Sequence, residues 1–130
     1  TATAQFLPLF GGIVSIDGSV SFSETPIDRI PMPPFLSNVA GSYAILITDE
    51  SMRPEFRIED IALVNPHLPP VPDKPCLFRS ALSGGTGCVR VLIRETGTHW
   101  VVGRHNPVGQ DKLPKATWPH CHRIVGRYNR

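Results

Sequence analysis

The sequence predicts a single, mainly β domain. Proline is abundant, at 14 of 130 residues, and a proline inside a helix removes a backbone donor and clashes with the preceding turn. Apolar runs are short and lie between turn residues, and no helical period of apolar residues persists along the chain. A chain of this length is sufficient for one compact hydrophobic core, so we expect one structural unit.

The first segment, residues 1–37, is expected to be an N-terminal arm that wraps around the domain rather than packs as regular structure. Its apolar start runs from Phe6 to Ile16 and is interrupted by Pro8 and by Gly11-Gly12. A polar stretch and a cluster of prolines follow. Apolar anchors in so long a connection indicate an arm that lies on a body. Residues 38–130 are expected to form that body.

Strands are predicted from residue 43 onward, because apolar and β-branched runs of strand length recur there. A turn limited by Pro54 follows the first run. Ser83-Gly84-Gly85-Thr86 is typical of a hairpin turn between the third and fourth runs. The predicted strands cover residues 43–48, 61–64, 76–82, 87–94, 98–103 and 123–128.

Composition excludes several classes of protein. The formal net charge of +2 is too small to indicate a nucleic-acid-binding surface. No apolar run reaches the length of a membrane span, and the start of the chain lacks a signal-peptide pattern. Three cysteines, an odd number, favour reduced thiols in a cytoplasmic protein over a disulfide framework. The chain begins at Thr1 rather than Met, so we expect it to be part of a longer protein.

A metal site is considered at His120-Cys121-His122 together with His99 or His105, because His120 and His122 share one face of a strand. No third or fourth ligand follows at a recognisable spacing, although zinc sites normally show one. We therefore predict no metal and no cofactor. Gly84–Gly87 is glycine-rich but lacks the following lysine and helix of a phosphate-binding loop, so it is interpreted as the hairpin turn.

The segment from Tyr43 to Val64 resembles the core of the C-terminal domain of LexA and phage CI-like repressors. In that family a strand leads into a Gly-Asp-Ser-Met-x-Pro turn, where this chain has Asp49-Glu50-Ser51-Met52-Arg53-Pro54. The resemblance implies a twisted β-sheet of the signal-peptidase type and, in active members, a serine–lysine peptidase that cuts its own linker. Further matches cover nearly the whole chain, at Leu7–Gly11, Pro69–Pro75, Val89–Leu92, His105–Pro107 and Ile124–Arg127.

The resemblance places the family's nucleophile at Ser51 and its general-base lysine at Arg90. A serine hydroxyl is a weak nucleophile until a base takes its proton, and a lysine is that base only when it is neutral. An arginine keeps its proton, so it is not a general base. A positioned base contributes about 10²–10⁴ in rate, so we expect Arg90 nearly to abolish self-cleavage.

Two further departures agree with a degenerate peptidase. Active relatives are cut at a small apolar pair such as Ala-Gly. The matching positions here are Ser15-Ile16 or, after a small shift, Asp17-Gly18. The other departure is Asp49-Glu50 in place of Gly-Asp before the serine, which removes a glycine from a tight turn.

The resemblance therefore implies a regulatory and dimerisation domain of a transcriptional repressor. The repressor is expected to be a phage protein or a bacterial one, such as a regulator of the SOS response. Its expected partners are a second copy, operator DNA bound through a helix-turn-helix domain outside these residues, and a protein antirepressor; no membrane is expected. The pairing surface is expected to include Ile124, Val125 and Tyr128 on the closing strand.

Other interpretations stay open at this point. Ser51 is an active nucleophile if another group serves as its base, or an ordinary turn residue if the site is not catalytic. Arg90 is an ordinary strand residue, or pairs with Glu50 or Asp60. A polymerase accessory subunit of the UmuD type shares the implied fold and also has a short N-terminal arm.

Overall fold

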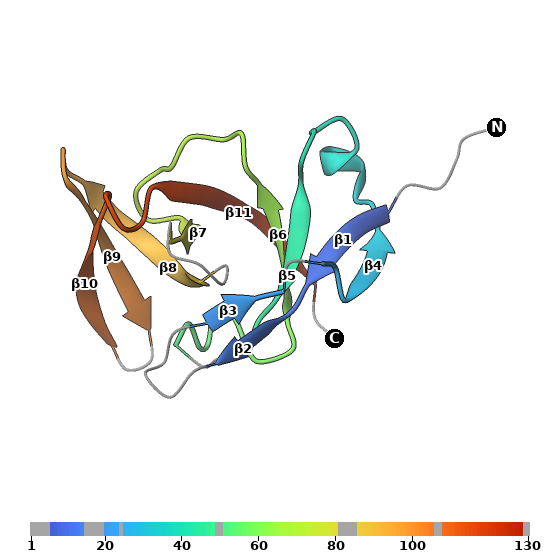
Figure 1. Ribbon diagram of the computed structural model, residues 1–130, viewed down its shortest axis with the longest axis horizontal. Helices are drawn as coiled ribbons and strands as arrows, with labels where there is room; N and C mark the ends of the chain where they lie inside the picture. The colour runs from blue at the N-terminus through green and yellow to red at the C-terminus, as the bar shows by residue number, and fades with distance from the viewer. Residues whose placement is uncertain are drawn as a thin grey trace.

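The structure is a computed structural model, and it describes residues 6–14, 20–23, 25–48, 51–80, 86–105 and 108–128. These residues form 11 strands and one short 3-10 helix, with no α-helix among them. The strands join one open sheet in the order β10-β9-β8-β7-β11-β6-β5-β1-β4, with β2 and β3 branching from β8 (Figure 1). The prediction of a mainly β domain is confirmed. No helix in the described part of the chain is long and apolar enough to cross a membrane.

The strands expected from the apolar runs are all present, with their ends shifted by a few residues. β7 and β8 pair antiparallel, as the predicted hairpin requires, although residues 81–85 at its turn lie outside the described residues. The bounds are Tyr43–Leu46 for β5, Ile61–Asn65 for β6, Pro75–Arg79 for β7, Thr86–Glu95 for β8, His99–His105 for β9 and His120–Tyr128 for β11.

The first segment differs from the expected irregular arm, because it contributes four strands. These are β1 (Phe6–Phe10), β2 (Gly12–Val14), β3 (Val20–Phe22) and β4 (Asp28–Pro31), and β1 pairs with both β4 and β5. Leu7 and Leu9 are almost completely buried on either side of Pro8. Burying each leucine contributes roughly 1.5–3 kcal/mol, more than the roughly 1 kcal/mol of the hydrogen bond that a proline forgoes. Hydrophobic burial therefore outweighs the missing donor.

Two other elements complete the chain. The 3-10 helix η1 (Pro34–Leu36) follows β4 and begins with proline, whose fixed φ suits a first helical position. β10 (Val108–Pro114) was not expected, because its sequence VGQDKLP has few apolar residues. It lies at the sheet edge against β9, where alternate side chains face solvent and do not need to be apolar.

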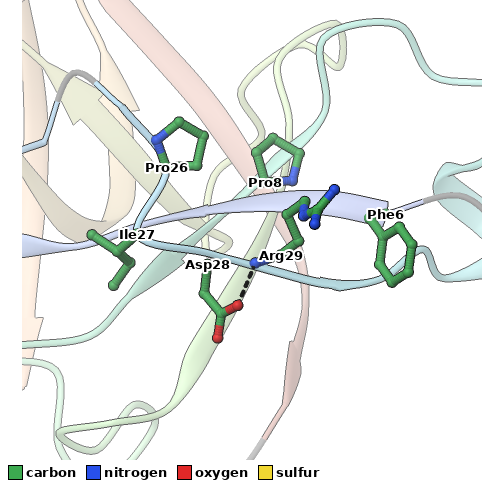
Figure 2. Close-up of a pocket in the computed structure, with 6 residues that line it drawn as sticks. All are labelled: Phe6, Pro8, Pro26, Ile27, Asp28 and Arg29. Atoms are coloured by element: carbon green, nitrogen blue, oxygen red, sulfur yellow. Dashed lines mark hydrogen bonds between the residues drawn. The ribbon is translucent and has the colours of Figure 1, made fainter.

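The opposite edge of the sheet is β4, where a side chain covers part of the backbone. Asp28 Oδ1 accepts a hydrogen bond from the backbone N–H of Arg29 at 2.7 Å, and Pro31 has no N–H to offer. These features discourage pairing with a foreign strand. Figure 2 shows this edge, with a shallow hollow of about 590 Å³ lined by Phe6, Pro8, Pro26, Ile27, Asp28 and Arg29.

The described residues form three hydrophobic core clusters, and two of them meet at β7 and β8. Leu77 and Val89 belong to the first, together with Met52 and Ile124. The second lies beneath η1 and includes Leu7, Leu36 and Leu63. Cys76, Phe78 and Leu92 lie on the other face of the same strands and form the third with Trp100 and Val102. Core contacts on both faces therefore hold β8 firmly.

Candidate functional site

The candidate site lies where β9 separates from β8. β7 runs along one side of β8. On the other side, β3 pairs with Thr86 and Gly87, and β9 pairs from Val91 onward. Between them, no described strand pairs with Cys88–Arg90 on that side. β8 and β9 therefore diverge at these residues, and this divergence is called the fork below.

Ser51 occupies this fork. Its carbonyl oxygen accepts a hydrogen bond from the backbone N–H of His105, the last residue of β9, at 2.9 Å. Its hydroxyl oxygen accepts one from Nη1 of Arg90 on β8, also at 2.9 Å. Ser51 thus connects the two strands at the point where they part, and the structure brings together the two residues that the sequence singled out.

The turn that begins at Ser51 is anchored by its own side chains. Met52 and Phe56 are 1% and 3% exposed and pack into the first core cluster. The backbone N–H of Phe56 donates to the carbonyl of Met52 at 2.9 Å, which closes a single turn. Because these two side chains are fixed in the core, they help to position Ser51 in the fork.

Arg90 is half-buried, and its Nη1 also donates to the carbonyl of Val89 at 2.8 Å. No described acidic residue forms an ion pair with it. Asp60, one expected alternative partner, accepts instead from the backbone N–H of Arg57 at 2.9 Å. Glu50, the other alternative, lies outside the described residues. The guanidinium is therefore directed at the serine and at its own strand.

A histidine–carboxylate pair adjoins the serine and was not recognised in the sequence. Nε2 of His105 lies 3.0 Å from Oε1 of Glu55, and both side chains are a little over one third exposed. The two residues are fifty positions apart, so no local pattern indicates their contact. Arg127 on β11 donates to the backbone carbonyl of Glu55, which fastens the turn to a second strand.

The predicted cleavage region, Ser15, Ile16, Asp17 and Gly18, lies outside the described residues. The strands on either side of it, β2 and β3, pair antiparallel. β3 continues the sheet at β8, the strand that carries Arg90. The region is therefore flanked by strands that join the sheet near the candidate site.

The three residues expected at a pairing surface are differently exposed. Ile124 is 6% exposed and packs in the first core cluster, Val125 is half-buried, and Tyr128 is 40% exposed. Phe35 of η1, which the sequence reasoning did not single out, is 57% exposed and lies over β11. A Cβ added at Gly126 would be 3.3 Å from Cζ of that ring. Phe35, Gly126 and Tyr128 are called the β11 patch below.

The histidines considered as metal ligands do share a face of β11. The ring centroids of His120 and His122 are 6.2 Å apart. Within the described ranges, no group of three or more histidine, cysteine, aspartate or glutamate side chains is arranged to hold a metal ion.

Cys76 and Cys121 form a thiol pair between β7 and β11, and their hydrogen bond lowers the pKa of Cys76 and raises that of Cys121.

Comparison with known proteins gives one informative similarity. No protein-family model matches the chain. The chain is similar to the repressor protein C of Rhizobium phage 16-3, with 39% identity over 67 residues. The matched part is 51% of this chain and 26% of the relative, so it spans about a quarter of that repressor.

Proposed function

We propose that this chain is the regulatory and pairing domain of a phage-repressor-like transcriptional regulator that has lost self-cleavage. The observation that carries the proposal is the 2.9 Å hydrogen bond from Arg90 Nη1 to Ser51 Oγ. It occurs between the two positions that the resemblance to LexA and CI-like repressors assigns to the nucleophile and its base. The similarity to a phage repressor supports the regulatory part of the proposal.

The direction of this hydrogen bond accounts for the loss of catalysis. A general base must accept the serine proton through a lone pair, as a neutral amine does. A guanidinium has only donors, and here Nη1 donates to the hydroxyl oxygen. The pair is thus in hydrogen-bonding contact but cannot transfer the proton in the required direction. Arg90 instead holds the Ser51 turn against β8.

Pairing is assigned to the β11 patch. Its aromatic residues Phe35 and Tyr128 are large and well exposed, and aromatic residues are common anchors of protein interfaces. In the proposed repressor, two paired copies present two DNA-reading domains to both halves of a palindromic operator. A protein antirepressor that covers this patch would release the DNA without cutting the chain.

The loss of cleavage is tested by incubating the purified protein at pH about 10, where an ordinary lysine base is substantially neutral. We expect the chain to stay intact in gel electrophoresis and mass spectrometry. Ser51→Ala serves as the control, because it removes the nucleophile. A pair of fragments that forms in the natural protein and is missing from Ser51→Ala would contradict the proposal.

A second candidate is a working Ser51 peptidase with a histidine base, and the His105–Glu55 pair favours it. A carboxylate that binds one ring nitrogen orients an imidazole, as it does in serine–histidine–carboxylate triads. Cleavage that is lost in His105→Gln as well as in Ser51→Ala would support this candidate. A polymerase accessory subunit has no comparable support, because the relative that was found is a repressor.

A further inference from the structure

A second group of polar side chains comes from β5, β7 and β11, and the proposed function does not use it. Arg79 on β7 lies directly opposite His120 on β11 in the strand register. His122 lies two residues further along the same face, with its ring centroid 6.2 Å from that of His120. Tyr43 Oη on β5 is 2.6 Å from His122 Nδ1. When Nε2 of His122 carries the ring proton, the tyrosine hydroxyl donates to Nδ1.

Arg79 is the permanent charge of this group, which contains no acidic residue. Burial is the main cause that lowers the pKa of His122, followed by Arg79 on β7, His120 on β11 and His67 in the loop after β6. No carboxylate among the described residues forms an ion pair with Arg79. A half-buried guanidinium without an anionic partner keeps donors that an anion can use. An anion between Arg79 and His120 would supply that partner.

The cationic side chain is held in place while part of it remains accessible. The guanidinium of Arg79 lies over the ring of Phe22 on β3, 5.8 Å from its centroid. It also stands beside the Tyr43 hydroxyl and counteracts the rise in the pKa of Tyr43 that burial causes. Arg79 and His122 are half-buried and His120 is exposed, so none of the three side chains is sealed in the core. Fixed donors bind with less loss of side-chain entropy than mobile ones.

We propose that Arg79, His120 and His122 form a binding site for a phosphate-type oxyanion. The planar guanidinium matches two oxygens of such an anion, and Nε2–H of His122 supplies another donor when Tyr43 donates to Nδ1. The anion is either a free phosphate compound or a phosphate of a DNA backbone, and both present the same oxygens. The inference does not depend on the loss of self-cleavage.

The test follows the histidine resonances by NMR at pH 7 while inorganic phosphate replaces chloride at constant ionic strength. We expect the signals of His120 and His122 to shift and to saturate, with a Kd of roughly 1 mM for one small anion at an open site. Arg79→Gln should weaken binding at least about tenfold, because a charge-assisted contact is lost. Arg94→Gln, at the other end of β8, should bind as the natural protein does.

Further variants and a DNA titration complete the test. His120→Gln changes an exposed side chain, so it also reports on the site if Arg79→Gln does not fold. A short duplex that shifts the same resonances would identify the phosphate as that of DNA, whereas a response to inorganic phosphate alone would identify a free oxyanion. Shifts that do not saturate, or that are the same in Arg79→Gln and His120→Gln, would overturn the proposal.

Discussion

Arg90 Nη1 donates a hydrogen bond to the hydroxyl oxygen of Ser51 at 2.9 Å, across the fork between β8 and β9. The two residues are 39 positions apart in the chain, and core contacts hold the segment that carries each of them. Val89 and Leu92 anchor β8 on its two faces, while Met52 anchors the turn. In the proposed function, this contact joins the nucleophile position to the residue that replaces its base.

Replacing the arginine by lysine is predicted to restore cleavage. In Arg90→Lys, an amine that is able to lose its proton stands beside Ser51, and cutting should increase as the pH rises from about 7 to about 10. The measurement is fragment formation over time at several pH values. Arg90→Lys/Ser51→Ala is the control and should stay intact. An uncut Arg90→Lys protein at every pH would show that another feature also blocks the reaction.

Self-association is predicted to depend on the β11 patch. Tyr128→Asp places a charge on this apolar surface, so it should shift the protein toward monomer in sedimentation at tens of micromolar, roughly the range of weak dimers. Val108→Asp is the matched control, because Val108 is 88% exposed on the edge strand β10, which does not pair with β11. A natural protein that is strictly monomeric at these concentrations would contradict pairing through this domain.

Stability is predicted to fall in mild acid because of His122. Burial lowers the pKa of His122 in the folded state, so the unfolded chain binds the proton more tightly. The contribution of neutral His122 to stability is complete above the ordinary histidine pKa of about 6.5. It is lost as the pH falls from there through the lower pKa of His122 in the folded protein. Denaturant unfolding between pH about 7.5 and 5 measures this loss. His122→Phe should show a weaker dependence on pH, whereas His99→Gln on β9 should retain it.

The third core cluster is predicted to depend on Phe78. This residue is fully buried on β7, and its ring lies 5.8 Å from that of Trp100 between centroids. Phe78→Ala should lower the free energy of unfolding by about 3–5 kcal/mol, because it removes buried area and leaves a cavity. Phe6→Ala, at a half-exposed position, should cost much less. Equal losses in the two variants would show that the cluster is not packed as described.

The sequence alone was sufficient to predict the strands whose residues form a short apolar run. β5 and β6 are short apolar runs in which nearly every residue is buried, so composition and length identify them. β1 and β10 carry weaker signals, because Pro8 interrupts the first and the second has few apolar residues. β10 is stabilised by pairing with β9, the strand before it, whereas β1 pairs with β5, which is distant in sequence. Local patterns do not encode such pairings.

The candidate site was likewise predictable from the sequence only in part. Side-chain chemistry is a property of the residue, so the sequence by itself determined that residue 90 is an arginine, whose guanidinium has hydrogen-bond donors only. Whether this arginine reaches the serine, and whether His105 meets Glu55, depended on the tertiary structure. Hydrogen bonds act over about 3 Å, and only the packing of distant strands brings such atoms within that range.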